Sequence, residues 1–169
     1  MIFIYNCYGG THTSSLASEI HLNRLPGDRK PTRDEILNAK YFNKLTYKDM
    51  RKLIFRGVDD EGNKVFTLGR GMTKTLIPFL EDFINFLHSE CDLKERFVVS
   101  NLSPTVPPFL TAGGFLSRGL GINFLGVPLL VAGSRQAYDR IIKIVKRTRD
   151  QSRNFEGKIL VLDNKDMQI

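Results

Sequence analysis

The stretch IFIYNCYGGTHTSSLASEI, residues 2–20, decides the fold class of this chain. It opens with an apolar run of β-branched and aromatic residues that a glycine pair stops, which predicts a buried strand at about residues 2–6. Over residues 13–23 the apolar side chains recur at helical spacing, which predicts a helix. A buried strand that leads through a tight turn into a helix is typical of an α/β protein.

The rest of the chain repeats this alternation of apolar strands and amphipathic helices. Two capping boxes, at 32–35 and 46–49, predict a short helix at 33–39 and another that carries Met50, Leu53 and Ile54. Further along, the sequence predicts a hairpin at 55–68, helices at 73–89, 107–120 and 134–149, and strands at 96–102, 127–133 and 158–163. Continuously apolar strands favour a parallel sheet that is covered on both faces. The predicted fold is one α/β domain over residues 1–169, a three-layer, Rossmann-like α/β/α sandwich with a mainly parallel sheet, strand 2–6 at its centre and a small β-hairpin insertion.

Composition limits the class of protein. The chain has 169 residues, 41% of them hydrophobic and 25% charged, which fits one globular domain. With only Cys7 and Cys91 a disulfide scaffold is excluded, and we expect a reducing, cytoplasmic location. We expect neither secretion nor a membrane span, because no apolar run is long enough and no basic region precedes the first one. The net charge of +7 favours an anionic partner, which composition leaves open as phosphate, nucleotide or nucleic acid.

Polar residues follow the predicted strands at the positions where open α/β sheets bind ligands. In the loop after strand 2–6 the glycine pair permits a close backbone approach, and the following helix presents free amide groups, which attract anions. The predicted anion-binding residues are Gly9, Gly10, Thr11, Thr13, Ser14, Ser15, Arg70, Asn101, Ser103, Ser134 and Arg135. The alternative is structural, with the glycine pair making only a tight turn and Thr13 or Ser14 only capping the helix.

Two residues of this loop are candidates for catalysis. His12 is the only histidine predicted to lie in a loop, where it is suited to donate or accept a proton or to contact an anion. Cys7 stands where the C-x5-R loop of low-molecular-weight phosphatases has its nucleophile, but Thr13 occupies the arginine position. Arg70 or Arg135 is a possible substitute for that arginine, yet we expect Cys7 to be a small buried residue rather than a nucleophile.

Other known motifs fit less well. A Walker loop would need three diagnostic residues that this loop lacks, and the similar loop of nucleotide-sugar glycosyltransferases normally works with a second domain. No histidine pair has metal-ligand spacing, so no metal is expected, and the cofactor stays undetermined. His21 and His88 are expected to be surface or packing residues, and the acidic cluster at 59–61 to be solvated.

Several blocks of the sequence together resemble the bacterial family known as domain of unknown function 3189, over about residues 1–148. These blocks are YNCYGGTHTSSLASEIHLNRLP, PTRDEIL, GVDDEGNKVFTLGRG and GGFLSRGLGINFLGVPLLVAGSRQAY. The resemblance implies no established activity, substrate or cofactor. It singles out as motif residues Cys7, Tyr8, Gly9, Gly10, His12, Ser14, Arg70 and Arg135.

These observations leave three functions open. The leading hypothesis is a protein that binds a phosphorylated small molecule or nucleotide at residues 9–15; whether it is an enzyme stays open, and phosphoryl-transfer or phosphate-ester chemistry is the first class to test. The alternative is a non-catalytic basic module that binds nucleic acid or an acidic protein through Lys143, Lys146, Arg147 and Arg149. The third is an assembly protein whose glycine-rich helix at 107–120 packs on a second copy to form a homodimer.

Overall fold

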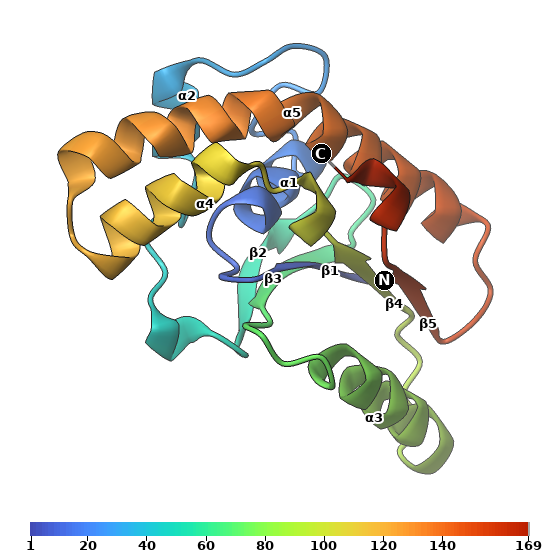
Figure 1. Cartoon of the computed structure of the whole chain (residues 1–169). Coiled ribbons are helices and arrows are strands. Elements are labelled where there is room, and N and C mark those ends of the chain that lie inside the picture. Colours follow the sequence, from blue (N-terminus) through green and yellow to red (C-terminus); the bar gives the residue numbers. More distant parts are fainter. Residues whose placement is uncertain (169) are drawn as a thin grey trace.

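The computed structural model describes residues 1–168 and shows an α/β fold around a five-stranded, mainly parallel sheet (Figure 1). The strands lie in the order β2-β3-β1-β4-β5. Their bounds are β1 Ile2–Cys7, β2 Leu53–Val58, β3 Lys64–Gly69, β4 Phe97–Asn101 and β5 Ile159–Leu162. β1 pairs in parallel with β3 and β4, and β2 pairs antiparallel with β3 at the edge. The predicted central position of strand 2–6 is confirmed.

Residues 1–168 form five α-helices and four short helical segments, of which all but the last segment lie between strands. The α-helices are α1 Thr13–His21, α2 Arg33–Asn38, α3 Leu76–Glu90, α4 Pro108–Gly114 and α5 Asn123–Arg153. Three single 3-10 turns are η1 Tyr47–Asp49, η2 Ser103–Thr105 and η4 Lys165–Met167, and η3 Phe115–Gly119 is a π-helical segment that continues α4. Within the described residues no helix is long and apolar enough to cross a membrane.

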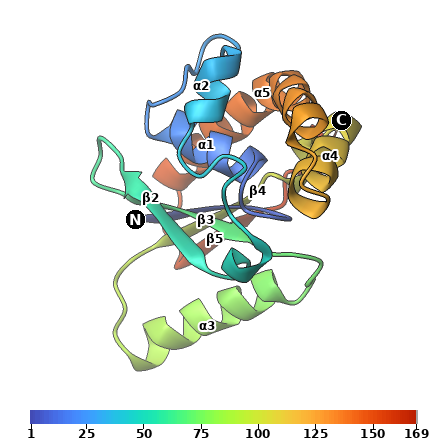
Figure 2. The same cartoon turned by 90° about the vertical axis from the view of Figure 1, so that its left-hand side faces the viewer.

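Helices lie on both faces of the sheet (Figures 1 and 2). Successive residues of β1 point to opposite faces, as the pleat of a strand requires. Phe3 and Tyr5 face a large core that also contains side chains of α1, α4 and α5, whereas Ile4 faces a small core against which α3 packs. Every residue of α1 is buried, so the loop after β1 leads into the most enclosed part of the molecule.

Two successive connections pass over opposite faces of the sheet. The connection from β3 to β4 contains α3, and the one from β4 to β5 contains α4 and α5. Both connections move across the sheet in the same direction, so they have opposite hands, although connections between parallel strands are nearly always right-handed. The C-terminal half therefore departs from a regular doubly wound sheet.

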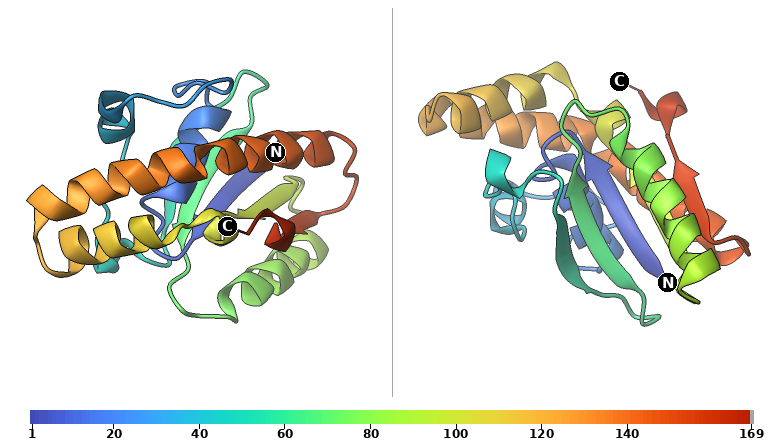
Figure 3. Two further views of the ribbon diagram at one scale, coloured as in Figure 1. Left: turned by 45° about the horizontal axis from the view of Figure 1, so that its top comes forward. Right: turned by 90° about the horizontal axis from the view of Figure 1, so that it is seen from below.

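The strand predicted at 127–133 is wrong, because these residues lie inside the 31-residue helix α5 (Figure 3). Buried positions recur every three or four residues along α5, so one face of a continuous helix packs on the core although Pro128 lies within it. Glycines allow α4 and α5 to touch closely: a Cβ on Gly133 would lie 2.6 Å from the backbone nitrogen of Leu110. Tertiary packing against α4 thus places this apolar run in a helix.

The prediction of a helix that carries Met50, Leu53 and Ile54 is also wrong. The expected capping contact is present, with Thr46 N–H donating to Asp49 Oδ2 at 2.9 Å, but it holds only the single turn η1. Leu53 and Ile54 instead begin β2, where they pair with Leu68 and Thr67 of β3. The other predicted capping box, at the start of α2, is present as expected.

Candidate functional site

The candidate site lies at the carboxyl edge of the sheet, where β3, β1 and β4 end side by side. On one side of β1, the Arg70 N–H donates to the Cys7 carbonyl at 3.0 Å. On the other side, the Leu102 N–H donates to the Asn6 carbonyl at 2.7 Å. The polar loops that follow strand 2–6 and strand 96–102 therefore meet at one edge. The third loop expected there, after 127–133, is not present because those residues lie in a helix.

The glycine pair is packed against the end of β3. Gly10 has a φ of +70°, a conformation that side chains disfavour, and a Cβ there would lie 2.6 Å from the backbone nitrogen of Gly69. A Cβ on Gly69 would lie 2.8 Å from the Gly9 carbonyl oxygen. Three glycines thus bring two backbones into contact and fix the position of the loop that follows Cys7.

The Cys7 thiol is enclosed by this loop and is 4% exposed. The Gly10 N–H donates to Cys7 Sγ at 3.2 Å, and Ser14 Oγ lies 3.1 Å from the same sulfur. Thr13, the first residue of α1, is fully buried, and among residues 1–168 its Oγ1 has no hydrogen-bond partner. Two of the sequence-predicted residues, Gly10 and Ser14, therefore contact the same sulfur atom.

Arg70 crosses the end of β1. Its Nη2 donates to Ser103 Oγ at 3.1 Å, and Ser103 follows β4, whereas Arg70 follows β3. Because β1 lies between these strands, the Arg70 side chain extends across the carboxyl end of β1, where the loop of residues 8–12 (the Cys7 loop) begins. Asn101 positions Ser103 by accepting its N–H at 3.0 Å and donating to the Asp163 carbonyl at 3.3 Å. The Nε of Arg70 is buried and has no partner in the described part of the chain.

Two predicted anion-binding hydroxyls point elsewhere. Thr11 Oγ1 donates to the Tyr41 carbonyl and Ser15 Oγ donates to the Lys40 carbonyl, both at 2.8 Å. These bonds hold the segment after α2 against α1, so both hydroxyls are already used in packing the chain.

His12 also faces this segment. Its Nε2 lies 3.3 Å from Asn43 Oδ1, and its ring packs edge-on against Phe42. Burial lowers the pKa of His12 to about 4, with the Asn43 hydrogen bond opposing and the Arg118 charge adding to this effect. At neutral pH the ring is therefore uncharged, and Asn43 continues the contact by donating to Ser117 Oγ at 2.8 Å.

The two predicted residues after 127–133 lie within α5. Ser134 is buried in that helix and Arg135 is exposed on it, so no strand end presents them. The glycines predicted to contact a second copy pack within the chain. Gly113 lies against Leu130 of α5, and a Cβ on Gly114 would lie 3.3 Å from His12 Cε1.

A buried hydrogen-bonded chain at the opposite, amino edge of the sheet was missed by the sequence analysis. Tyr5 Oη lies 2.7 Å from His21 Nδ1, and His21 Nε2 lies 2.9 Å from Asp59 Oδ2. Burial lowers the pKa of His21, against the raising effect of Asp59, so a neutral ring accepts from Tyr5 and donates to Asp59. The acidic cluster is thus only partly solvated, since the Asp59 side chain is 3% exposed. The position of Asp59 in a predicted turn did not indicate its contact with His21.

Arg56 is a second missed residue. It lies on the edge strand β2, yet it is 1% exposed and forms a buried ion pair with Glu19 Oε1 at 3.1 Å. Its guanidinium also donates to Ser15 Oγ at 2.9 Å and lies 5.0 Å from the Tyr41 ring centre. The local sequence of the predicted hairpin does not reveal this contact, because the partner Glu19 lies in α1.

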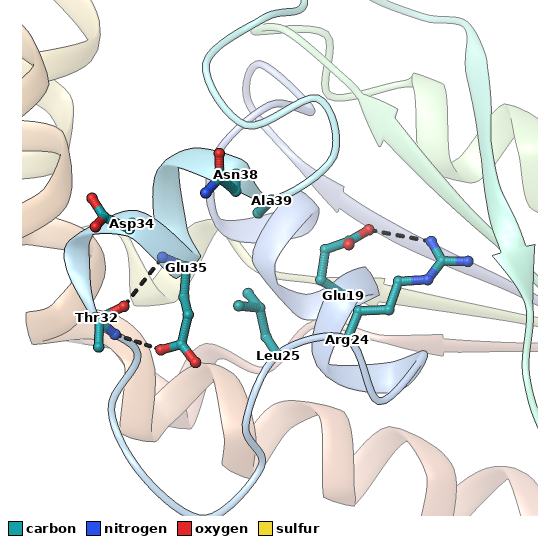
Figure 4. Close-up of a pocket in the computed structure, with 8 residues that line it drawn as sticks. All are labelled: Glu19, Arg24, Leu25, Thr32, Asp34, Glu35, Asn38 and Ala39. Carbon is teal, nitrogen blue, oxygen red and sulfur yellow. Dashed lines mark hydrogen bonds and ion pairs between the residues drawn. The ribbon is translucent and has the colours of Figure 1, made fainter.

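A pocket of about 410 Å³ lies away from this edge, between α1 and α2 (Figure 4). Its lining includes Leu25, the Glu19–Arg24 ion pair at 3.7 Å and the Thr32–Glu35 capping contact. None of the predicted site residues lines it. We therefore place the candidate site by its chemistry, at the Cys7 loop, and not by the volume of this pocket.

The basic helix segment is partly neutralised. Arg147 forms two hydrogen bonds to Asp166, at 2.8 and 2.6 Å, and Arg149 lies 3.6 Å from Glu61. Lys143 and Lys146 remain exposed on α5. The predicted cluster of four cations thus offers fewer free charges to a polyanion than the sequence indicates.

Comparison with known proteins assigns the chain to a family. Residues 2–150 match the family model described as "Protein of unknown function (DUF3189)", and this range includes β1, β3, β4 and α1. The chain belongs to this family, as the sequence blocks indicate. No curated protein and no solved structure matches the chain.

Proposed function

We propose that the protein binds a phosphorylated small molecule or nucleotide at the carboxyl edge of the sheet, over the Cys7 loop. The Arg70 guanidinium carries this proposal, because it spans the end of β1 next to a glycine-rich loop and the N-terminus of α1. A guanidinium and backbone amide groups are the groups that proteins use to hold phosphate oxygens. Ser103 contributes a hydroxyl at the same place.

Among the described contacts, the Arg70 guanidinium has no carboxylate partner. Its side chain donates one hydrogen bond, and the acceptor is the neutral Ser103 hydroxyl. An anion that replaced this hydroxyl would gain a charge-assisted hydrogen bond. Phosphoryl-transfer or phosphate-ester chemistry is the reaction class that such a site would support. His12 is neutral and bonded to Asn43, so within this proposal it acts by shaping the loop.

For the fold we propose the more specific description of a three-layer, Rossmann-like sandwich with a β-hairpin insertion. Helices on both faces and the antiparallel pairing of β2 with β3 support it, and the opposite hands of the last two connections argue against a strict version.

Replacing Arg70 by alanine is expected to weaken binding of inorganic phosphate about tenfold or more, since a hydrogen bond to a charged group contributes about 1.5–3 kcal/mol. The measurement is thermal shift against phosphate and nucleoside monophosphates. The matched control is Arg33→Ala, on the exposed face of α2, which should leave the shift unchanged. If no anion stabilised the wild type, or if Arg70→Ala behaved like the wild type, the proposal would be wrong.

A further inference from the structure

We propose that Cys7 is the nucleophile of a phosphoryl-transfer reaction on aryl phosphate monoesters, with Arg70 in the role of the arginine that the loop lacks. This inference rests on the phosphate site proposed above. It reverses the expectation, drawn from the sequence alone, that Cys7 only fills space.

The contacts of the sulfur are the first step. Cys7 Sγ receives the Gly10 N–H at 3.2 Å and lies 3.1 Å from Ser14 Oγ. If Cys7 is ionised, Ser14 must be the donor, because a thiolate has no proton to give. Two donors at the base of a loop, beside the N-terminus of α1, form the kind of surroundings in which thiolates act as nucleophiles. A cysteine that only filled space would need neither donor.

The position of Arg70 is the second step. In a C-x5-R loop the arginine directly precedes the serine, and here Thr13 occupies that place. Arg70 reaches the same edge from β3, held by its N–H bond to the Cys7 carbonyl at 3.0 Å. Its side chain crosses the end of β1 to reach Ser103, so the positive charge lies at the carboxyl end of the strand that Cys7 terminates. Arg70 therefore takes the place of the loop arginine in space, although it comes from a distant part of the sequence.

Two buried polar atoms of residues proposed for this site lack a hydrogen-bond partner. Thr13 is fully buried and its Oγ1 has no partner, and the Nε of Arg70 has none either, among residues 1–168. Buried polar atoms without partners are costly, and a phosphoryl oxygen would accept a hydrogen bond from each. Ser103 can release Arg70 to such an oxygen, since it holds the guanidinium through one neutral hydrogen bond.

We infer the substrate class from two exposed side chains that are close in the chain to Cys7 and Arg70. The Gly71 N–H donates to the Tyr8 carbonyl at 2.9 Å, so the backbone that carries Tyr8 lies beside the segment that leads from Arg70 to Met72. Tyr8 is 49% exposed and Met72 is 85% exposed. Both side chains offer apolar contact to an aromatic ring, which sulfur and aromatic groups favour.

The reaction balances without a further reactant. The Cys7 thiol loses its proton to solvent, and Sγ forms a bond to phosphorus as the bond from phosphorus to the aryl oxygen breaks. The phenolate leaves with that electron pair and takes a proton from water. A water molecule then attacks phosphorus, the bond from sulfur to phosphorus breaks, and inorganic phosphate leaves. Arg70 stabilises the charge on the transferred group in both steps.

The test compares two cysteine variants on para-nitrophenyl phosphate. Cys7→Ser is expected to lower turnover by about 10³-fold or more while keeping the thermal shift caused by inorganic phosphate. Cys91→Ser is the matched control, because Cys91 is exposed at the end of α3, and both turnover and shift should persist. Mass spectrometry of the acid-quenched wild type should find one phosphoryl group on the peptide that contains Cys7.

A second measurement does not depend on the folding of Cys7→Ser. In the Cys91→Ser chain, Cys7 is the only cysteine, so alkylation by iodoacetamide reports on it alone. Inorganic phosphate is expected to slow this alkylation at least several-fold. Normal phosphate binding without a Cys7 phosphoryl group, or with full turnover in Cys7→Ser, would overturn the nucleophile and leave the binding site intact. If the wild type did not bind inorganic phosphate, both proposals would be overturned.

Discussion

Replacing Gly10 by alanine is expected to lower the free energy of unfolding by about 2–4 kcal/mol. One part of this loss comes from the backbone, because Gly10 has a φ of +70°, which an L side chain disfavours. The other part is steric, since the new Cβ would lie 2.6 Å from the nitrogen and 2.9 Å from the Cα of Gly69. Both atoms belong to the backbone of β3, an interior strand of the sheet, so neither moves aside easily. Urea unfolding, followed by circular dichroism, measures the change.

The neighbouring glycine supplies a matched control. A Cβ on Gly9 would meet only Thr11 Cγ2, at 3.7 Å, which is an ordinary contact. Gly9→Ala should therefore change stability by less than about 0.5 kcal/mol. Gly69→Ala, whose Cβ would lie 2.8 Å from the Gly9 carbonyl oxygen, should resemble Gly10→Ala. Equal effects of Gly9→Ala and Gly10→Ala would show that the loop is not packed on β3 as described.

The first part of the fold is predictable from sequence because its local patterns agree with the tertiary structure. A β-branched run, a glycine pair and a helical period lie within residues 2–20, and local chemistry agrees with the tertiary structure at each point. The run at 127–133 differs, because a short apolar segment has no period that separates a strand from a buried helix. The spacing of Gly126, Leu130 and Gly133 fits one helix face, but only contact with α4 shows that it is used.

The candidate site is predictable to a similar degree. The sequence places Cys7, Ser14 and Arg70 after strands, and the parallel order brings them to one edge. It does not show which hydroxyls the backbone already uses, as for Thr11 and Ser15, because their partners come from a segment more than twenty residues away. The crossing of Arg70 to Ser103 depends on strand order, which no local pattern contains.

Stability is expected to fall as the pH drops below about 6.5, because two histidines are held neutral in the folded protein. Burial lowers the pKa of His12 from 6.5 to about 4, and burial also lowers that of His21. Below 6.5 the unfolded chain binds protons at these positions and the folded chain does not. The contribution of neutral His12 to stability is fully present above pH 6.5. It is lost progressively as the pH falls from 6.5 to about 4. Between pH 6.5 and 5 His12 alone is expected to cost about 2 kcal/mol, and His21 acts in the same direction.

The measurement is urea unfolding at pH 7 and pH 5 for the wild type and three glutamine variants. His12→Gln and His21→Gln should each be less stable than the wild type at pH 7, because hydrogen bonds to Asn43 and to Tyr5 and Asp59 are disturbed. Each should also lose less stability between the two pH values, since one neutral histidine has been removed.

His88→Gln is the control, because His88 lies on α3 and bonds the Glu95 carbonyl outside both clusters. Asp59 does not obscure the result. Burial is the largest single effect on its pKa and raises it, but hydrogen bonds from His21 and Asn63 together lower the pKa below 3.8, so the contribution of Asp59 is lost only below that pH. A wild type equally stable at both pH values would contradict the buried, neutral state of these rings.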